Sequence, residues 1–421
     1  AIIAGMGWAY EVRGWGGYGA WDPVENASFI PWLTCTAYLH SAMVQERRGM
    51  LKLWNLNLMV GTFVLTILGT FLTRSGIISS VHAFTQGTIG YYFLAFIAIV
   101  LLTTLVMVAG NSDKLGSTGK LDAAFSRETV FLGNNLFLTV FMFTVLIGTL
   151  FPLIAELVRG VKVSVGEPFF NRMSIPLIVA LLFLMGVGPA LPWKRAPGPE
   201  LKAKLLPGVV LGLLAGAAGL VAGARNPYSV LAFTFAGFAG AVNIGEFVSG
   251  ANARVRAHGE HWLLALSRLV GGNRRRYGGY IAHLGIVLVA LGVTASGTFK
   301  TEREATLKPG ETITLAGRTL RLKGVWGREE AQRQVIGATM EVMNGGRVIG
   351  TVEPRMNYYP TSQAPVPTPE VRSALAGDLY LFMNLAPKEM ELPARNPETG
   401  EMEVRKRLVP MPDILLLADA A

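Results

Sequence analysis

The chain has 421 residues, of which 51% are hydrophobic and only 16% are charged, and its mean hydropathy is +0.41. Soluble globular proteins carry about 25% charged residues, so this composition excludes an ordinary soluble enzyme and a disordered chain. It indicates a polytopic membrane protein. The single cysteine, Cys35, excludes a disulfide framework, a CxxC metal or redox site and a covalently attached c-type haem, because no CxxCH is present. Its apolar neighbours predict a small buried side chain.

Eight apolar runs have about the 20 residues that cross the hydrocarbon core of a bilayer. Seven of them contain no Asp, Glu, Lys or Arg, and the remaining one contains only Glu246. The predicted spans are 27–44, 54–73, 90–110, 131–154, 173–192, 206–223, 229–249 and 278–297. The chain begins inside a further apolar run and without Met, which predicts that residues 1–9 are the tail of a truncated span in a longer protein.

The loop charges predict the orientation of these spans, because cytoplasmic loops carry an excess of Lys and Arg. The loops 45–53, 111–130, 193–205 and 250–277 hold 16 basic residues, whereas the opposite loops hold 6. The first set is therefore predicted to be cytoplasmic. The net charge of +10 belongs to these loops beside anionic lipid, which argues against a nucleic-acid partner.

The composition changes after Phe299, since residues 300–421 hold 16 basic and 16 acidic residues. Strand-like alternation at 312–315 and 318–325 flanks a turn at 316–317, and Asn344-Gly345-Gly346 predicts a second hairpin. The Pro-rich stretch 360–369 predicts a loop. We therefore expect an all-α polytopic membrane bundle with a small extracytoplasmic β-domain. The expected parts are the tail 1–9, an outer tryptophan-rich loop 10–26, a bundle of eight spans over 27–298, and a β-rich domain over 299–421.

The segment 14–33, GWGGYGAWDPVENASFIPWL, is the most unusual part of the sequence. Trp and Tyr at a bilayer interface are typical of an aromatic belt, and Asp22-Pro23-Val24-Glu25 is also a good helix start. Neither explanation accounts for the glycines between the aromatic residues. Glycines remove side-chain bulk and aromatic rings offer flat faces, so the segment predicts a shallow platform for a large flat ligand.

This segment resembles the tryptophan-rich "WWD" signature of the haem-handling proteins of cytochrome c maturation. The stretches LHSAMVQERRG, LTRSGIISSVHAF and AHLGIVLVALG are similar to the CcmF family of haem lyase subunits, and the resemblance covers most of the chain, including the β-rich part. It implies that Trp15, Tyr18 and Trp21 form the haem platform of the loop 10–26, with Asp22 and Glu25 in a positioning role. Gly19 and Ala20 stand where the family usually has Trp and Phe, which thins this platform.

His40 and His283 lie at equal depth in two different predicted spans, about five residues from the cytoplasmic end of each. Neutral imidazole is a good axial ligand for haem iron, and ionisable groups at such depth are usually functional. The pair therefore favours an intramembrane bis-histidine haem, while hydrogen-bonded histidines between helices remain the alternative. The resemblance assigns both residues as the axial ligands of an intramembrane haem b.

An external loop carries His82, which on sequence alone is a solvated residue. The resemblance implies that it is an axial ligand of the haem that sits transiently on the tryptophan platform. Arg74 and Arg13 are the basic residues of the outer loops around this platform. They are candidate partners for haem propionates, although interface anchors of this kind are also common.

The resemblance implies a haem lyase that acts as part of a complex in the bacterial inner membrane, with its tryptophan motif and β-domain on the periplasmic face. Haem would arrive on the haem chaperone CcmE and be attached to the CxxCH thiols of apocytochrome c, which a CcmH-type thiol-reducing partner presents. The haem b would reduce the iron, with quinol as a candidate donor. No side chain has the setting of a nucleophile, which suits a positioning role.

The sequence leaves three alternative functions open. A haem exporter or carrier-loading protein of the same superfamily would share the tryptophan motif without an intramembrane haem. A quinol-oxidising cytochrome b subunit would use His40 and His283 but would leave the glycine–aromatic segment and His82 unexplained. A secondary transporter ranks last, because it predicts charged groups near the bilayer midplane.

Overall fold

The computed structural model describes residues 2–12, 17–19, 21–75, 88–116, 126–161, 163–193, 198–360, 365–374, 377–395 and 402–420. These residues divide into two compact units. One unit is helical and comprises residues 21–298, and the other joins residues 1–20 to the β-rich residues 299–421. Helices with a β-domain are thus the observed fold class, as the sequence predicts.

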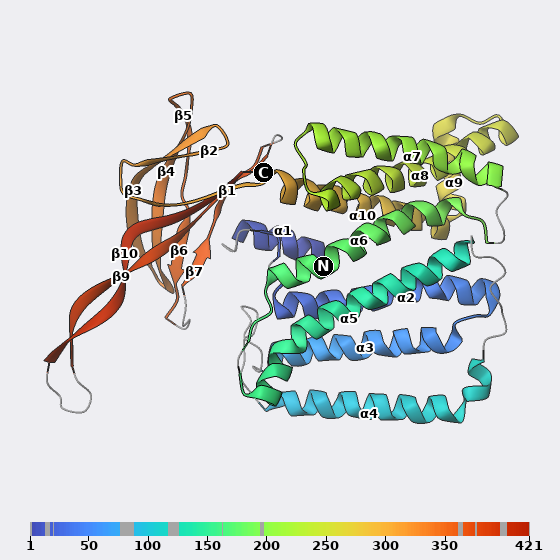
Figure 1. Cartoon of the computed structure of the whole chain (residues 1–421), viewed down its shortest axis with the longest axis horizontal. Coiled ribbons are helices and arrows are strands. Elements are labelled where there is room, and N and C mark those ends of the chain that lie inside the picture. The colour runs from blue at the N-terminus through green and yellow to red at the C-terminus, as the bar shows by residue number, and fades with distance from the viewer. Residues whose placement is uncertain are drawn as a thin grey trace. The chain divides into compact units, whose positions relative to one another are not determined.

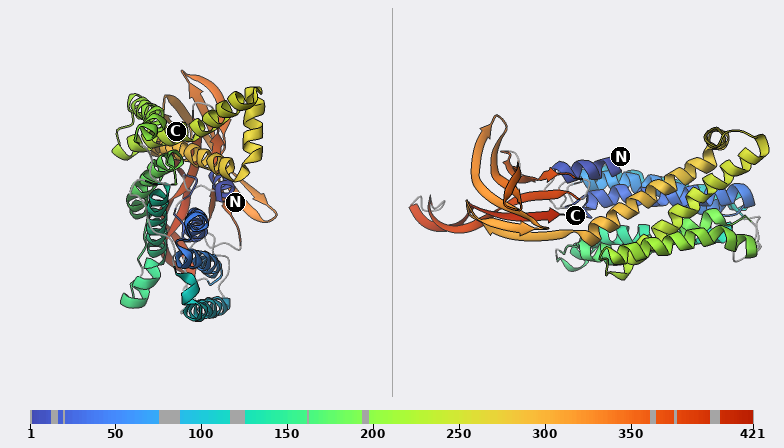
Figure 2. Two further views of the ribbon diagram at one scale, coloured as in Figure 1. Left: turned by 90° about the vertical axis from the view of Figure 1, so that its right-hand side faces the viewer. Right: turned by 90° about the horizontal axis from the view of Figure 1, so that it is seen from above.

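The helical unit is built from long helices that run roughly side by side, as Figure 1 and the end-on view of Figure 2 show. Successive helices alternate in direction, which agrees with the alternating loop charges. The helices are α2 (Pro23–Arg48), α3 (Lys52–Arg74), α4 (Ile89–Gly110), α5 (Arg127–Arg159), α6 (Glu167–Ala190), α7 (Gly198–Val221), α8 (Pro227–His258), α9 (Trp262–Gly272) and α10 (Arg274–Phe299), with a short 3-10 turn η1 (Ser112–Leu115) after α4.

Seven helices in the described part of the chain are long and apolar enough to cross a membrane: α3, α4, α5, α6, α7, α8 and α10. Helix α2, which contains the predicted span 27–44, is not among these seven. Its polar side chains lower its hydropathy, and several of them face neighbouring helices. Ser41, fully buried, hydrogen-bonds to Asn55 of α3, and Thr62 of α3 donates to Thr34 at 2.8 Å. Internal polar contacts of this kind let a helix of lower hydropathy lie within a bundle.

Two further predictions about this unit are wrong in detail. The segment 250–277 is largely helical rather than a loop, because α8 continues to His258 and α9 occupies Trp262–Gly272. His261 caps α9, and its side chain accepts a hydrogen bond from the Leu263 amide at 3.3 Å. Cys35 is exposed rather than buried, because it lies on a face of α2 that no neighbouring helix covers.

The β-rich unit contains two antiparallel sheets, and its core consists of Leu, Val and Met side chains between them. One sheet has the order β1-β10-β9-β8, and the other has the order β2-β3-β4-β6-β7 with β5 paired to β4. The strands are β1 (Thr301–Leu307), β2 (Thr312–Leu315), β3 (Arg318–Glu330), β4 (Arg333–Asn344), β5 (Arg347–Val352), β6 (Arg355–Tyr358), β7 (Val366–Thr368), β8 (Glu370–Arg372), β9 (Leu379–Arg395) and β10 (Met402–Ala420).

Both predicted hairpin turns of this unit are confirmed. Ala316 and Gly317 join β2 to β3 with φ of 45° and 76°, and Gly345 and Gly346 join β4 to β5 with φ of 56° and 82°. Positive φ at both central residues is the geometry that a two-residue hairpin needs. The proline-rich stretch is only partly a loop, since the short strand β7 lies within it and pairs with β6.

Helix α1 (Ile2–Val12) belongs to the same unit as the β-domain. Tyr10 stacks on Tyr18 with ring centres 5.4 Å apart and contacts the Tyr380 ring of β9 in a tilted arrangement at 5.1 Å. Its hydroxyl donates to Asp378 at 3.3 Å. Tyr10 thus links Tyr18, which lies within the tryptophan-rich loop, to the strand β9.

Candidate functional site

His40 of α2 and His283 of α10 lie opposite each other inside the helical unit. Their imidazole ring centres are 6.2 Å apart, and the ring planes differ by only 3°. The two helices do not approach each other closely along their backbones in the described residues. Helix α2 packs against α3 and α5, whereas α10 contacts α8 through side chains such as Val287 beside Gly240. The predicted pairing of these histidines is therefore present in the fold.

Hydrogen bonds orient both imidazoles in the same way. Nδ1 of His40 lies 2.8 Å from the carbonyl oxygen of Thr36, one turn earlier in α2. A carbonyl oxygen only accepts, so Nδ1 carries the hydrogen and Nε2 presents its lone pair. Nδ1 of His283 lies 3.3 Å from Oδ1 of Asn243, a fully buried residue of α8. The Asn243 amide nitrogen donates to the Ala239 carbonyl at 2.8 Å, which fixes Oδ1 toward the histidine.

The free nitrogens of this pair are suited to bind a metal centre from two sides. Among the described residues, Nε2 of His40 and Nε2 of His283 have no hydrogen-bond partner. A metal ion about 2 Å from each of two facing imidazole nitrogens would place the ring centres about 6 Å apart, which is the separation found here. Histidine ligands commonly donate their other nitrogen to a carbonyl, and this orients the ring. The residues present therefore fit a six-coordinate haem iron.

Basic and aromatic side chains surround the pair toward one end of the bundle, which we call the basic end. It is formed by the C-terminus of α2 and the N-termini of α5 and α10, and its arginines are Arg47, Arg48, Arg127, Arg275 and Arg276. Phe131 of α5 contacts the His40 ring edge-on at 5.6 Å and Trp193 edge-on at 5.6 Å. Phe131 and Trp193 thus lead from the histidine pair toward these arginines.

The tryptophan-rich loop is anchored to the helical unit through Trp21. Its ring stacks on Phe170 of α6 with centres 5.0 Å apart, and its Nε1 donates to Asn171 at 2.9 Å. Asn26, buried in α2, donates to the Trp21 carbonyl at 3.1 Å and to Thr149 of α5 at 3.0 Å. Trp21 has φ of 54°, an uncommon value outside glycine that these contacts stabilise. One face of the Trp21 ring is therefore used for packing.

The acidic pair after Trp21 serves the helix start. The Asp22 carboxylate accepts a hydrogen bond from the Val24 amide at 3.0 Å, and Glu25 lies in the first turn of α2 beside the positive end of the helix dipole. Both features agree with the capping explanation. Arg74 is the last residue of α3. Arg13, Trp15 and His82 lie outside the described residues.

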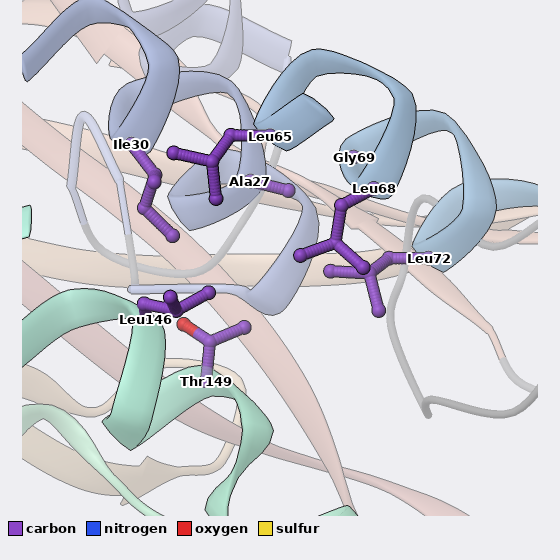
Figure 3. Close-up of a pocket in the computed structure, with 8 residues that line it drawn as sticks. All are labelled: Ala27, Ile30, Leu65, Leu68, Gly69, Leu72, Leu146 and Thr149. Atoms are coloured by element: carbon purple, nitrogen blue, oxygen red, sulfur yellow. The ribbon is translucent and has the colours of Figure 1, made fainter. Parts of the chain in front are cut away.

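A small pocket between α2, α3 and α5 is lined almost entirely by apolar side chains, which Figure 3 shows facing one another. Its free volume of about 10 Å³ is what one water molecule needs. It is far too small for a porphyrin. Gly69 lies against the Ala27 backbone here, where an added Cβ would meet the carbonyl oxygen at 3.2 Å, so the pocket is a packing feature of closely spaced helices.

Several residues of the site were not singled out from the sequence. Asn243 is an amide in an otherwise apolar span, which is a usable signal for a buried polar contact. The spacing of seven residues between each histidine and an arginine, His40 to Arg47 and Arg276 to His283, is a second signal. The sequence did not distinguish Phe131 and Trp193 as site residues, because aromatic residues are common near the ends of membrane spans.

Comparisons with known proteins agree with the geometry. The family described as Cytochrome C assembly protein matches residues 1–79, and the family described as CcmF C-terminal beta-sandwich matches residues 298–395. The cytochrome c-type biogenesis protein CcmF of Pseudomonas aeruginosa is 35% identical over 384 residues, which are 91% of this chain and 57% of that protein. The protein of the same name from Escherichia coli is 33% identical over 391 residues, 90% of this chain and 57% of that protein.

A solved structure titled Cytochrome c Heme Lyase CcmF matches the whole chain. Its TM-score is 0.70 at 32% identity, and the match covers 100% of this chain and 59% of that one. The chain therefore spans a little under three fifths of the length of the relatives that it matches.

Proposed function

Because the chain resembles CcmF proteins over the part of their length that it spans, we propose that it is a member of that family and a haem lyase subunit of cytochrome c biogenesis. The pairing of His40 with His283 carries this proposal furthest. It points to an intramembrane haem b held between α2 and α10. A protein that only exports haem or loads a carrier has no need of such a cofactor.

The residues around this proposed haem have separate tasks. His40 and His283 would supply the two axial nitrogens, while Thr36 and Asn243 would keep both rings in the ligating tautomer. When bound, such a haem supplies one-electron transfer, which would keep the iron of the haem substrate ferrous with a quinol as donor. Phe131 packs against the edge of His40 and helps to exclude water from the site.

The second half of the proposal concerns haem as substrate at the outer face. Haem delivered by the chaperone CcmE would rest on the platform that includes Trp15, Tyr18 and Trp21, with His82 as its axial ligand. Arg13 and Arg74 would face its propionates. Each thiol of the CxxCH motif then adds across one vinyl group, so that a carbon–sulfur bond forms and the thiol hydrogen passes to the neighbouring carbon. This addition needs no net oxidation.

The proposed setting follows from the same assignment. The protein would lie in the bacterial inner membrane among lipid, with the basic loops in the cytoplasm. The tryptophan-rich loop and the β-domain would face the periplasm. There a CcmH-type thiol-reducing partner would present apocytochrome c. Asp22 and Glu25 would position the platform indirectly, because they fix the start of α2 directly after Trp21.

The first test is a visible absorption spectrum of the purified protein, oxidised and then reduced with dithionite. We expect a low-spin b-type spectrum that disappears in His40→Ala and in His283→Ala. His258→Ala is the matched control, because this histidine lies at the exposed end of α8, where its ring forms a hydrogen bond with the Arg254 carbonyl at 3.2 Å. A folded wild-type protein that binds no haem would refute the intramembrane site and favour a haem exporter of the same superfamily.

A further inference from the structure

Each ligand helix carries an arginine seven residues from its histidine, on the side of the basic end. In α2 this is Arg47 after His40, and in α10 it is Arg276 before His283. Seven residues are close to two helical turns, so the arginine and the histidine share one face of the helix and lie about 10 Å apart along its axis. Because the two helices run in opposite directions, both arginines lie on the same side of the histidine pair.

A third arginine joins them through Trp193. The guanidinium carbons of Arg47 and Arg127 both lie 5.8 Å from the centre of the Trp193 ring. Arg127 also donates to the Gly188 and Pro189 carbonyls at the end of α6, at 3.2 and 2.7 Å. These contacts hold Arg127 in place, and Arg47 lies at the same Trp193 ring, which contacts Phe131; Phe131 in turn contacts His40.

Arg276 is held in a different way. It pairs with Glu246 of α8 at 2.6 Å and donates to the Tyr280 hydroxyl at 3.2 Å. Tyr280 lies one turn before His283 and donates to the same carboxylate at 3.3 Å. Arg127 also interacts electrostatically with Tyr280, Arg276 and Glu246, so the two groups of side chains influence each other.

The network has a surplus of positive charge. Arg47, Arg127 and Arg276 face one carboxylate, Glu246, and neither Arg47 nor Arg127 forms an ion pair with any other described residue. The surplus is two charges. A haem has two propionate carboxylates on one edge of its ring, and arginine is the residue best suited to bind carboxylates through paired hydrogen bonds.

We infer that Arg47, Arg127 and Arg276 bind the propionate carboxylates of the haem held by His40 and His283. This inference rests on the proposed intramembrane haem and fixes its orientation, with the propionate edge toward the basic end and the vinyl edge toward the opposite end. A haem held between α2 and α10 by these histidines would have the three arginines near its edge on the side of the basic end. Trp193 and Glu246 act as positioning residues that keep the guanidinium groups at this edge.

The test compares two porphyrins in the purified haem-free protein. One is haem, and the other is haem dimethyl ester, whose propionates carry no charge. We expect the wild-type protein to bind haem at least tenfold more tightly than the ester, since a hydrogen bond to a charged group is worth about a tenfold change in affinity or more. In Arg276→Gln and in Arg47→Gln this ratio should fall toward one, and Arg276→Lys should recover part of it.

Arg275→Gln is the matched control. It removes the same charge from the adjacent residue of α10, but the Arg275 side chain is 71% exposed and pairs with Glu46. Its ratio should stay at the wild-type value. A wild-type ratio near one, with the bis-histidine spectrum present for both porphyrins, overturns the propionate site while the haem assignment stands. If Arg275→Gln lowered the affinity ratio by the same amount, the preference for haem would come from the general positive charge at this end, as in binding to anionic lipid. That result would also overturn the propionate site. A wild-type protein that binds neither porphyrin refutes the haem itself.

Discussion

Asn243 is the residue whose replacement tests the histidine geometry most directly. It is fully buried in α8, and its Oδ1 is the partner of the His283 Nδ1 at 3.3 Å. In Asn243→Ala the imidazole loses this acceptor while both axial nitrogens remain in the chain. The His283 ring can then turn or change tautomer, and its Nε2 no longer points permanently at the iron position.

The expected effect has two independent estimates. Loss of a group that orients a histidine ligand typically costs about 10- to 100-fold in metal affinity, which is about 1.4 to 2.7 kcal/mol. A buried donor left without its acceptor costs about 1 to 3 kcal/mol. The estimates agree, so Asn243→Ala should lower haem affinity by about 10- to 100-fold without abolishing the spectrum, as His283→Ala would.

The assay is a titration of the haem-free variant with haem, followed at the Soret band. Asn26→Ala is the control, because Asn26 is a similarly buried helical amide that donates to a backbone carbonyl, that of Trp21, at 3.1 Å, and it precedes His40 by fourteen residues in α2. It should lose stability and keep its haem affinity. Equal haem affinity in Asn243→Ala and the wild type would refute the conclusion that Asn243 orients His283.

Three further predictions concern stability. Arg48→Met should destabilise the protein by about 3 to 5 kcal/mol, because it leaves the fully buried Glu128 without the guanidinium at 2.8 Å, and Arg48→Met with Glu128→Leu should recover most of the loss in thermal unfolding. Gly212→Ala should cost about 1 to 3 kcal/mol, since its Cβ would meet a backbone oxygen of α8 at 2.6 Å; Gly245→Ala, where nothing lies within 4 Å, is the control. The Arg321 hydrogen bond lowers the pKa of Glu341 below 4.5, so this carboxylate stabilises the fold above that pH, and the stabilisation is lost as the pH falls through the lowered pKa. The difference in Tm between the wild type and Glu341→Gln should therefore shrink below about pH 4.5.

The helical architecture was largely predictable because hydrophobic length and loop charge are properties of single segments. Helix α2 marks the limit of that approach. Its run of 18 apolar residues is interrupted by Thr34, Ser41 and His40, and the hydropathy alone does not separate a buried polar helix from a span. The contacts of Ser41 and Thr34 with α3 explain why these polar residues are tolerated.

The histidine pair was predictable because depth in a span can be counted along the chain. Its supporting residues were not, because Asn243 and His283 are 40 residues apart and meet only through the packing of α8 and α10. The same applies to Trp21, whose stacking on Phe170 depends on α6. The aromatic platform remains a prediction from the sequence, whereas the use of one Trp21 face for packing became visible only in the fold.

The separation of the His40 and His283 rings depends on helices other than α2 and α10. Neither helix sets the 6.2 Å spacing of the imidazoles by direct packing on the other; each takes its position from other helices, α2 from α3 and α5, and α10 from α8. An ion pair between the two, Arg275 to Glu46, lies at the exposed end, where such a pair contributes about 1 kcal/mol or less. The spacing is therefore a property of the surrounding helices. A ligand can enter the pair without breaking a packed interface, and substitutions in α5 or α8 should affect it as strongly as substitutions in the ligand helices.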